Sequence, residues 1–360
     1  MLDFLIIGGG IAGLSAGARL SELGKVLLVE REDSLGFHTS GRSAALYEAD
    51  YGAPATVAVA RASGAELEAM GVLSPRGFMV VGRTEDREAF EQDVAALKLD
   101  VIPVSEAITR FPILNADAVA FAAYTDSAKN IDTELLMQSY GRMIRKNGGE
   151  IRTKSPVQAI ERVADGWRVS VAGTAIEARR VVNAAGAWAD QVAAMAGVPC
   201  IGLTPYRRSL AQLPAPGGRD VSGWPMVLGA GETWYAKPEA GKLLVSPADE
   251  DPVEPHDAFA DDMVLAEGLA RYEEMMTEPV TRVEMSWAGL RSFAPDRTLV
   301  LGPDPVEPAF VWCAGQGGQG FLSAPGAARV LADTMGGPKS GQPPEILKAL
   351  SPARFRSCGG

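Results

Sequence analysis

The glycine pattern near the start of the chain is the feature that most limits the fold. It consists of Gly8, Gly10 and Gly13. The glycines separate an apolar run over 3–7 from a segment of helical spacing over 11–23, and a second apolar run over 25–30 ends in Glu30. In such a βαβ unit the glycines make the turn, let the backbone approach a pyrophosphate and let the helix pack on the sheet. We therefore expect a dinucleotide site at the start of the helix, with Glu30 accepting hydrogen bonds from ribose hydroxyls.

The length and composition indicate a globular protein of two domains. A chain of 360 residues is too long to fold around one simple core. The 47% of hydrophobic and 22% of charged residues are ordinary for globular proteins, which excludes disordered and fibrous classes. The net charge of −11 repels phosphate backbones and anionic membranes, so we expect no nucleic acid partner.

Metal centres and disulfide frameworks find little support in the sequence. The two histidines, His38 and His256, have no metal-ligand spacing, so we expect no metal. Three widely spaced cysteines argue against disulfides and favour a reducing, cytoplasmic location. The first apolar run lacks the basic flank of a signal peptide, and no stretch is long enough to span a bilayer. The chemistry is therefore expected to come from a cofactor.

The pattern of strands and helices divides the chain into two interleaved domains. Short strands, a charged helix and turns rich in Pro and Gly over 76–132 and 204–287 predict a substrate domain with a mostly antiparallel sheet. The expected α/β, Rossmann-like domain comprises 1–75, 133–203 and 288–345. Helices are expected over 85–97, 132–147, 262–276 and 324–335. Residues 346–360, rich in Pro, Gly and Ser, are expected to form a loose C-terminal tail.

Two further segments favour a flavin site over a nicotinamide site. Segments 35–51 (LGFHTSGRSAALYEADY) and 183–188 (NAAGAW) resemble the flavin-binding signatures of the D-amino-acid oxidase and sarcosine oxidase (DAO) family of FAD-dependent oxidoreductases. The similarity covers nearly the whole chain and is greatest to the D-arginine dehydrogenases. It implies an α/β FAD-binding domain of the glutathione reductase type, joined to an α+β substrate domain.

The resemblance also implies which residues bind the FAD. The TSGRSAA segment runs along the pyrophosphate and flavin ring, the backbone of Val157 contacts the adenine, and a second glycine turn over 315–321 precedes a helix whose positive end stabilises a reduced flavin. No cysteine stands where sarcosine oxidases attach the flavin, so non-covalent FAD is expected. The expected cofactor-binding residues are Gly8, Gly10, Ile11, Ala12, Gly13, Glu30, Arg31, Thr39, Ser40, Arg42, Ser43, Ala44, Ala45, Val157, Ala184, Ala185, Gly186, Trp188, Gly289, Arg291, Gly317, Gly318, Gln319, Gly320 and Phe321.

A substrate site follows from the same resemblance. Arg291 matches the family arginine that binds the substrate carboxylate, for which a guanidinium fork is well shaped. Tyr235 matches a tyrosine that hydrogen-bonds this carboxylate, and Tyr51 one that closes the site; for each, a packing role stays open. One of the adjacent Arg207 and Arg208 matches a further site arginine. The sequence does not decide which of them faces inward, and Arg207 is taken as the candidate.

Three positions depart from the D-arginine dehydrogenases. Phe78 stands in place of a glutamate that pairs with the basic substrate, Leu46 in place of a histidine and Leu322 in place of a glutamine. These changes make the pocket less polar, so a preference for neutral or apolar side chains is expected. A preference for basic substrates would require another acid, with Glu48 and Asp50 as candidates.

The expected reaction is the oxidative deamination of a small amino acid, with D-amino acids as the first interpretation. A hydride leaves Cα for flavin N5, and the imino acid hydrolyses to a 2-oxo acid and ammonia. An oxidase of N-methyl or other secondary amino acids, similar to sarcosine and glycine oxidases, shares every motif and stays open. A flavin-binding protein without turnover is a further alternative. The electron acceptor, oxygen or a quinone, and the oligomeric state are not predicted.

Overall fold

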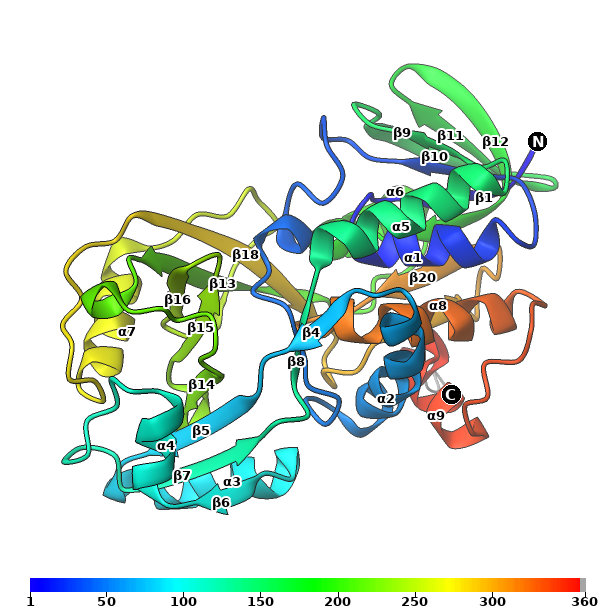
Figure 1. Cartoon of the computed structure of the whole chain (residues 1–360). Coiled ribbons are helices and arrows are strands. Elements are labelled where there is room, and N and C mark those ends of the chain that lie inside the picture. The colour runs from blue at the N-terminus through cyan, green and yellow to red at the C-terminus, as the bar shows by residue number, and fades with distance from the viewer. Residues whose placement is uncertain (357–360) are drawn as a thin grey trace.

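The predicted βαβ unit lies in the centre of an eight-stranded sheet (Figure 1). The computed structural model describes residues 1–356. β1 (Leu2–Ile7) pairs in parallel with β2 (Val26–Val29), and α1 (Ile11–Leu20) connects them. Strands from distant parts of the chain extend the parallel part in the order β9-β2-β1-β12-β20. They are β9 (Glu150–Arg152), β12 (Thr174–Asn183) and β20 (Phe310–Ala314).

Antiparallel strands complete this first sheet. β10 (Val157–Val163) and β11 (Gly166–Val171) form a meander with the first half of β12, and β19 (Val300–Pro303) pairs with β20.

Both faces of the first sheet are covered, which explains why its central strands are continuously apolar. Alternate residues of β1 face opposite sides. Phe4 and Ile6 pack against helices, whereas Leu5 and Ile7 pack in a separate cluster with Trp167. The helices on the first face are α1, α2 (Pro54–Ala69), α5 (Thr133–Lys146) and α8 (Gly320–Thr334), with α6 (Ala189–Met195) on the other. Figure 1 shows α1, α5 and α8 side by side.

A nine-stranded, mostly antiparallel sheet forms the other half of the molecule (Figure 1). Its order is β17-β13-β16-β15-β14-β5-β7-β6, with β18 beside β13. In chain order its strands are β5 (Phe78–Gly82), β6 (Asp100–Ile102), β7 (Phe121–Thr125), β13 (Thr204–Leu213), β14 (Met226–Gly229), β15 (Tyr235–Glu239), β16 (Lys242–Ser246), β17 (Asp251–Pro252) and β18 (Met285–Phe293). The helices of this half are α3 (Arg87–Leu97), α4 (Val104–Arg110) and α7 (Asp262–Glu273).

A small three-stranded sheet of β3 (Leu46–Tyr47), β8 (Lys129–Ile131) and β4 (Leu73–Pro75) joins the two halves. The fold class expected from the sequence is confirmed: α/β and α+β, with a Rossmann-like FAD-binding part and a mostly antiparallel second sheet. The exact domain boundaries stay a prediction, and β18 runs across the expected boundary between 287 and 288.

Helix ends differ from the expectations where tertiary packing decides them. The first helix ends at Leu20 rather than at 23. The last predicted helix begins at Gly320 instead of 324 and contains Pro325, because its first turn packs into the core through Phe321 and Leu322.

The expected loose tail is instead folded as far as residue 356. α9 (Pro344–Leu350) and a short 3-10 helix (Pro352–Phe355) follow α8, and Leu350 is fully buried in the first core. Arg354 binds both carboxylate oxygens of Asp296, at 2.6 and 3.1 Å. The rest of the predicted tail, residues 357–360 with Cys358, lies outside the described residues. Across residues 1–356, no helix combines the length and apolar character needed to cross a membrane.

Candidate cofactor and substrate site

Three adjoining cavities lie where the ends of β1 and β12 meet the second sheet. Cavity A, of about 970 Å³, is lined by Glu30, Val157 and Trp188 among others. Cavity B, of about 890 Å³, contains the start of α1 and the second glycine turn. Cavity C, of about 660 Å³, is lined by residues that include Tyr51 and Phe78.

The cavities adjoin one another and share lining residues. A and B share Gly10, Thr39, Ser40, Ala184 and Gly186. B and C share Ser43, Ala44, Arg208, Tyr235, Arg291 and Gly318. One elongated ligand can therefore occupy A and B while a second molecule occupies C.

The first glycine turn has no room for side chains. Gly8 has a φ of +112°, and a Cβ there would lie 2.4 Å from the carbonyl oxygen of Ala184. A Cβ on Gly13 would lie 1.9 Å from the carbonyl oxygen of Gly8. Gly13 lines none of the three cavities, so its part is to bring α1 close to the strand end. The turn thereby presents the positive N-terminus of α1 to cavities A and B.

Two side chains fix the walls beside this turn. The Glu30 carboxylate accepts hydrogen bonds from the backbone N–H groups of Gly9 and Glu32, at 2.6 and 2.9 Å. Ser40 Oγ accepts one from the N–H of Ile11 at 3.0 Å, directly at the start of α1. Glu30 is thus held in the wall of cavity A, where the sequence predicted a partner for ribose hydroxyls.

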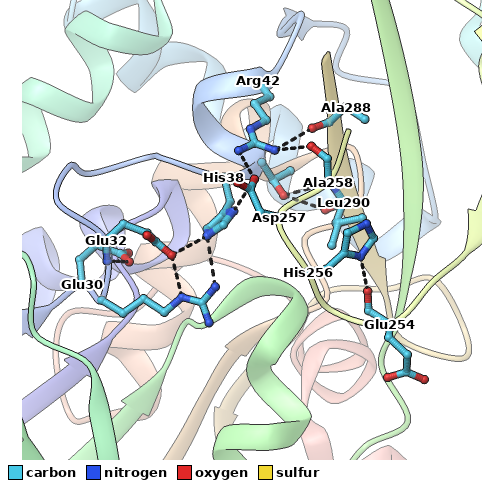
Figure 2. A network of polar contacts seen from close by, with 12 residues as sticks. Glu30, Glu32, His38, Arg42, Glu254, His256, Asp257, Ala258, Ala288 and Leu290 are labelled. Atoms are coloured by element: carbon cyan, nitrogen blue, oxygen red, sulfur yellow. Dashed lines mark hydrogen bonds and ion pairs between the residues drawn. The ribbon is translucent and has the colours of Figure 1, made fainter. Parts of the chain in front are cut away.

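A polar network over 31–42 covers cavity A and joins it to the second half of the molecule (Figure 2). Glu32 Oε1 lies 2.8 Å from Arg31 Nε and 2.9 Å from His38 Nε2. The Arg31 guanidinium lies 4.1 Å from the centre of the Trp188 ring, a cation–π contact. Figure 2 shows His38 between Glu32 and Asp257, which also pairs with Arg42.

Arg42 and Thr39 attach segment 35–51 to β18. Arg42 Nη1 donates to the carbonyl oxygens of Ala258 and Ala288, at 2.7 and 3.0 Å (Figure 2). Thr39 Oγ1 donates to the carbonyl oxygen of Leu290 at 2.9 Å. Both residues line cavity B, so its wall is held by strong contacts between distant segments.

The second glycine turn brings the N-terminus of α8 against cavity B. Gly317 donates its N–H to the Ser292 carbonyl oxygen at 2.9 Å, and a Cβ on it would lie 2.2 Å from Phe293. A Cβ on Gly318 would lie 3.1 Å from Arg291 Cζ, so this glycine leaves space for the guanidinium. The α8 dipole therefore favours negative charge in cavity B.

The prediction for Gln319 is not supported by its position. This residue lines none of cavities A to C. Its side chain lies beside Gly52, where a Cβ would be 2.7 Å from Gln319 Nε2. Gln316, three residues earlier, lines cavity B instead. The chain direction changes between Gln316 and Gln319. The sequence does not reveal which of the two side-chain amides faces cavity B.

The arginine choice is corrected to Arg208. Arg207 points away from the cavities and pairs with Asp249 and Asp251, at 3.3 and 2.7 Å. Arg208 is 6% exposed and lines cavities B and C. Neighbouring residues of a strand point to opposite faces, so β13 can direct one of these two arginines inward.

The two inward guanidiniums make one end of cavity C strongly cationic. Arg208 Nε and Nη1 are buried and have no hydrogen-bond partner among residues 1–356, and Glu232 and Glu250 are 3.8 Å from its nitrogens. Burial lowers the pKa of Arg208, and the charge of Arg291 lowers it further. Buried charges require partners, so this end of the cavity attracts an anion.

Two tyrosines lie at the same end. Burial raises the pKa of Tyr51 to about 12, so its phenol is a neutral hydrogen-bond donor at ordinary pH. Burial alone would lower the pKa of Arg291, but Tyr51, Tyr235 and Glu232 raise it. Arg291 therefore stays charged beside two phenol donors.

The opposite walls of cavity C are apolar. Phe78 on β5 is 5% exposed, and Leu46 on β3 and Leu322 on α8 line the same space, together with Met226 and Leu228. The sequence expected the first three of these residues to make a pocket of low polarity, and they do lie together. Two acids also lie in the walls of cavity C: Glu48, which the sequence analysis left open as a candidate, and Glu232, which no motif indicated.

Most of the predicted site residues line the three cavities. For the cofactor they are Gly8, Gly10, Ile11, Ala12, Glu30, Arg31, Thr39, Ser40, Arg42, Ser43, Ala44, Ala45, Val157, Ala184, Ala185, Gly186, Trp188, Gly289, Arg291, Gly317, Gly318, Gly320 and Phe321. For the substrate they are Arg291, Tyr235, Tyr51 and Phe78. Lining residues without a sequence signal include Ser155 and Met195 in cavity A.

Neither described cysteine reaches the cavities. Cys200 is exposed and Cys313 is buried in β20, and neither lines A, B or C. Within residues 1–356, no three His, Cys, Asp or Glu side chains gather in a way that could hold a metal ion.

Comparison with known proteins identifies the family. The model of the DAO family, described as FAD dependent oxidoreductase, matches residues 3–334. The chain belongs to this family. It is therefore an FAD-dependent oxidoreductase, and cavities A and B fit that cofactor: the glycine turn at Gly8 leaves space, two helix N-termini face the cavities, and Glu30 stands in the wall.

The individual relatives support membership of the family and do not indicate one particular branch of it. FAD-dependent oxidoreductase domain-containing protein 1 of Mus musculus is 25% identical, over 92% of this chain and 81% of that protein. Glycine oxidase of Bacillus licheniformis is 23% identical, over 96% of each. Neither is a D-arginine dehydrogenase, so the narrower expectation of greatest similarity to that branch is not supported.

Solved structures show the same fold. Glycine oxidase from Geobacillus kaustophilus has a TM-score of 0.81 at 21% identity, covering 96% of this chain and 97% of that one. Iminodiacetate oxidase from Chelativorans sp. BNC1 has a TM-score of 0.77 at 22% identity, covering 97% and 98%.

Proposed function

We propose that this oxidoreductase acts on a small amino acid, oxidising the bond between its α-carbon and its nitrogen, and that glycine-type or N-substituted amino acids are the preferred substrates. The observation that carries the proposal is the pair of guanidiniums of Arg208 and Arg291 at the junction of cavities B and C. A carboxylate bound there lies beside the cofactor cavity, so the atom next to the carboxylate is the one presented for oxidation.

The residues of cavity C orient the substrate. Arg291 binds the carboxylate by charge-assisted hydrogen bonds, and Arg208 offers further donors from two nitrogens that have no hydrogen-bond partner among residues 1–356. Tyr235 is buried in the same wall and donates from its phenol, while Tyr51 lies between cavity C and the outside. Holding the carboxylate at several points fixes the α-carbon and lowers the entropic part of the barrier.

Hydride acceptance is the chemistry that FAD would supply when bound, because the side chains cannot supply it. The chain contributes electrostatics: the N-terminus of α8 and the guanidinium of Arg291 place positive charge around cavity B. Phe78, Leu46 and Leu322 exclude water from the far side of cavity C. Cavity C holds no histidine, so the amine is expected to react after losing its proton to solvent.

The preference for glycine-type or N-substituted amines is supported by the names of the relatives. They include glycine oxidases and an iminodiacetate oxidase. A D-amino acid with a neutral or apolar side chain is the second candidate, which the apolar wall around Phe78 favours.

Anaerobic mixing of the holoenzyme with a substrate panel tests this function. The panel comprises glycine, sarcosine, other N-methyl amino acids, iminodiacetate, D-Leu and D-Met, and the readout is loss of the oxidised flavin absorbance. Fast bleaching by the glycine-type or N-substituted members is expected. Bleaching by D-Leu and D-Met alone would favour the second candidate, and bleaching by no amino acid would contradict both.

A further inference from the structure

Glu48 is a buried acid in the wall of cavity C that the carboxylate-binding residues leave without a partner. Glu48 directly follows β3 in the chain and is 7% exposed. Glu48 Oε1 accepts the backbone N–H of Asp50 at 3.2 Å. Oε2 is shielded from solvent and has no hydrogen-bond partner among residues 1–356. Burying a carboxylate oxygen without a partner is costly, so this oxygen lacks the group that would compensate for its burial.

Glu48 forms no ion pair with either guanidinium, whereas Glu232 and Glu250 lie 3.8 Å from nitrogens of Arg208. Burial and the carboxylate of Asp50 raise the pKa of Glu48, while the Asp50 N–H lowers it. Arg208 and Arg291 interact with each other, with Tyr51 and Tyr235, and with Glu232, the other acid in the wall of cavity C. Cavity C therefore has a cationic end and a distinct acidic point.

Apolar side chains line much of the same cavity. Phe78, Leu46 and Leu322 line the same cavity as Glu48, and Met226 and Leu228 extend the wall. Methylene groups would gain from contact with these side chains, whereas a polar chain would not. The cavity is thus suited to a molecule with an anionic end, an aliphatic middle and a cationic end.

The neighbouring acid Asp50 does not compete for this role. It pairs with Arg61 and Lys98 and lines an outer cleft instead of cavity C. Of the two acids that the sequence left open, Glu48 is the one in the cavity.

We propose that Glu48 determines specificity by binding a terminal cationic group of the substrate, an ammonium or guanidinium carried by the side chain or by the N-substituent. The inference rests on the proposed function, because the substrate carboxylate must bind at Arg208 and Arg291 for its other end to reach Glu48. It replaces the expectation of a wholly apolar substrate: the apolar wall contacts the methylenes, and Oε2 of Glu48 accepts the charge-assisted hydrogen bond at their end.

Two acids that cannot be oxidised next to their carboxylate test this inference without turnover. 6-Aminohexanoate and hexanoate share the carboxylate and the methylene chain and differ in the terminal ammonium. Their dissociation constants for the holoenzyme are measured by calorimetry. The variants are wild type, Glu48→Gln, which keeps an oxygen for the Asp50 N–H, and Asp50→Asn as a control acid outside cavity C. We expect wild type and Asp50→Asn to bind 6-aminohexanoate about tenfold or more tightly than hexanoate, and Glu48→Gln to lose that preference.

The outcomes separate the inference from the proposed function. Equal binding of the two acids by wild type, or an unchanged preference in Glu48→Gln, overturns the role of Glu48 and leaves the carboxylate site intact. Binding of neither acid contradicts the carboxylate site, and the inference fails with it. Lysine and norleucine, as both enantiomers and as Nα-methyl derivatives, give the corresponding comparison in kcat/KM.

Discussion

Arg208 on β13 and Arg291 on β18 lie on the same face of the second sheet. Tyr206 is the register partner of Arg291, and Arg208 is two residues further along the same strand. The charge of Arg291 lowers the pKa of Arg208, so the two cations repel each other in the buried site. Glu232 and Glu250, each 3.8 Å from an Arg208 nitrogen, offset this repulsion in part, and a bound carboxylate relieves it further.

Replacement of Arg208 is expected to weaken carboxylate binding selectively. A charge-assisted hydrogen bond contributes about 1.5–3 kcal/mol, so Arg208→Met should raise the Kd for a carboxylate ligand roughly ten- to a hundredfold. Arg207→Met is the matched control: it removes the ion pairs with Asp249 and Asp251 outside the cavities and should change stability more than affinity. Equal losses of affinity in both variants would show that Arg208 acts only through the fold.

The FAD is expected to be bound without a covalent link. Cys200 and Cys313 do not line the cavities. Acid precipitation of the yellow protein should therefore release FAD into the supernatant, where its absorbance and chromatographic mobility identify it. Flavin that remains with the precipitated protein contradicts this prediction.

The first glycine turn offers a steric test of the cofactor site. A Cβ on Gly13 would lie 1.9 Å from the carbonyl oxygen of Gly8, so Gly13→Ala must push α1 away from the strand end. Overpacking of this kind costs about 1–3 kcal/mol, and we expect a protein with a lower melting temperature and little bound FAD. Gly223→Ala is the control, because nothing lies within 4 Å of a Cβ at that position. Full FAD content in Gly13→Ala would show that the turn can shift without loss of the site.

Glu48 should make the ligand-free protein less stable at neutral pH. Its pKa is raised by burial above the ordinary 4.5, so the folded state retains a proton that the unfolded state loses as the pH rises above that value. The stability of wild type therefore falls as the pH rises from 4.5 through the folded pKa. Glu48→Gln lacks this titration. Its melting temperature should exceed that of wild type at pH 7, and the difference should vanish near pH 4. A lower melting temperature for Glu48→Gln at pH 7 would indicate that the charge stabilises the fold.

The sequence predicts the parts of the site that depend on local chain geometry. The glycine turns and Glu30 follow from the βαβ pattern, since each glycine is required by a close backbone contact within one unit. Arg291 and Tyr235 follow from the family resemblance. Glu48 lay in a recognised segment, but the cavity that it lines is completed by residues of β5, β14 and α8 from other parts of the chain.

For a similar reason, the sequence did not predict which face of a strand some residues occupy or how the C-terminal segment packs. Arg207 and Arg208 differ only in which face of β13 they occupy, and the pairing of β13 with β18 decides this. Gln316 and Gln319 differ in their place on one turn, which the contact of Gly317 with Ser292 fixes. The polar composition after residue 345 suggested a tail, but Leu350 is fully buried in the first core, where α9 contacts α2 and β19. In each instance tertiary contacts override the local signal.

The most direct test of the central claim compares an amino acid with the same amine lacking its carboxylate. Anaerobic holoenzyme is mixed with sarcosine or dimethylamine, and with glycine or methylamine, and the rate of flavin bleaching is followed at each concentration. If Arg208 and Arg291 present the carbon next to a bound carboxylate, the amino acid of at least one pair bleaches the flavin, and its amine does so at least about a hundredfold more slowly at equal concentration. Bleaching by the simple amines at the same rate as by the amino acids would contradict the account.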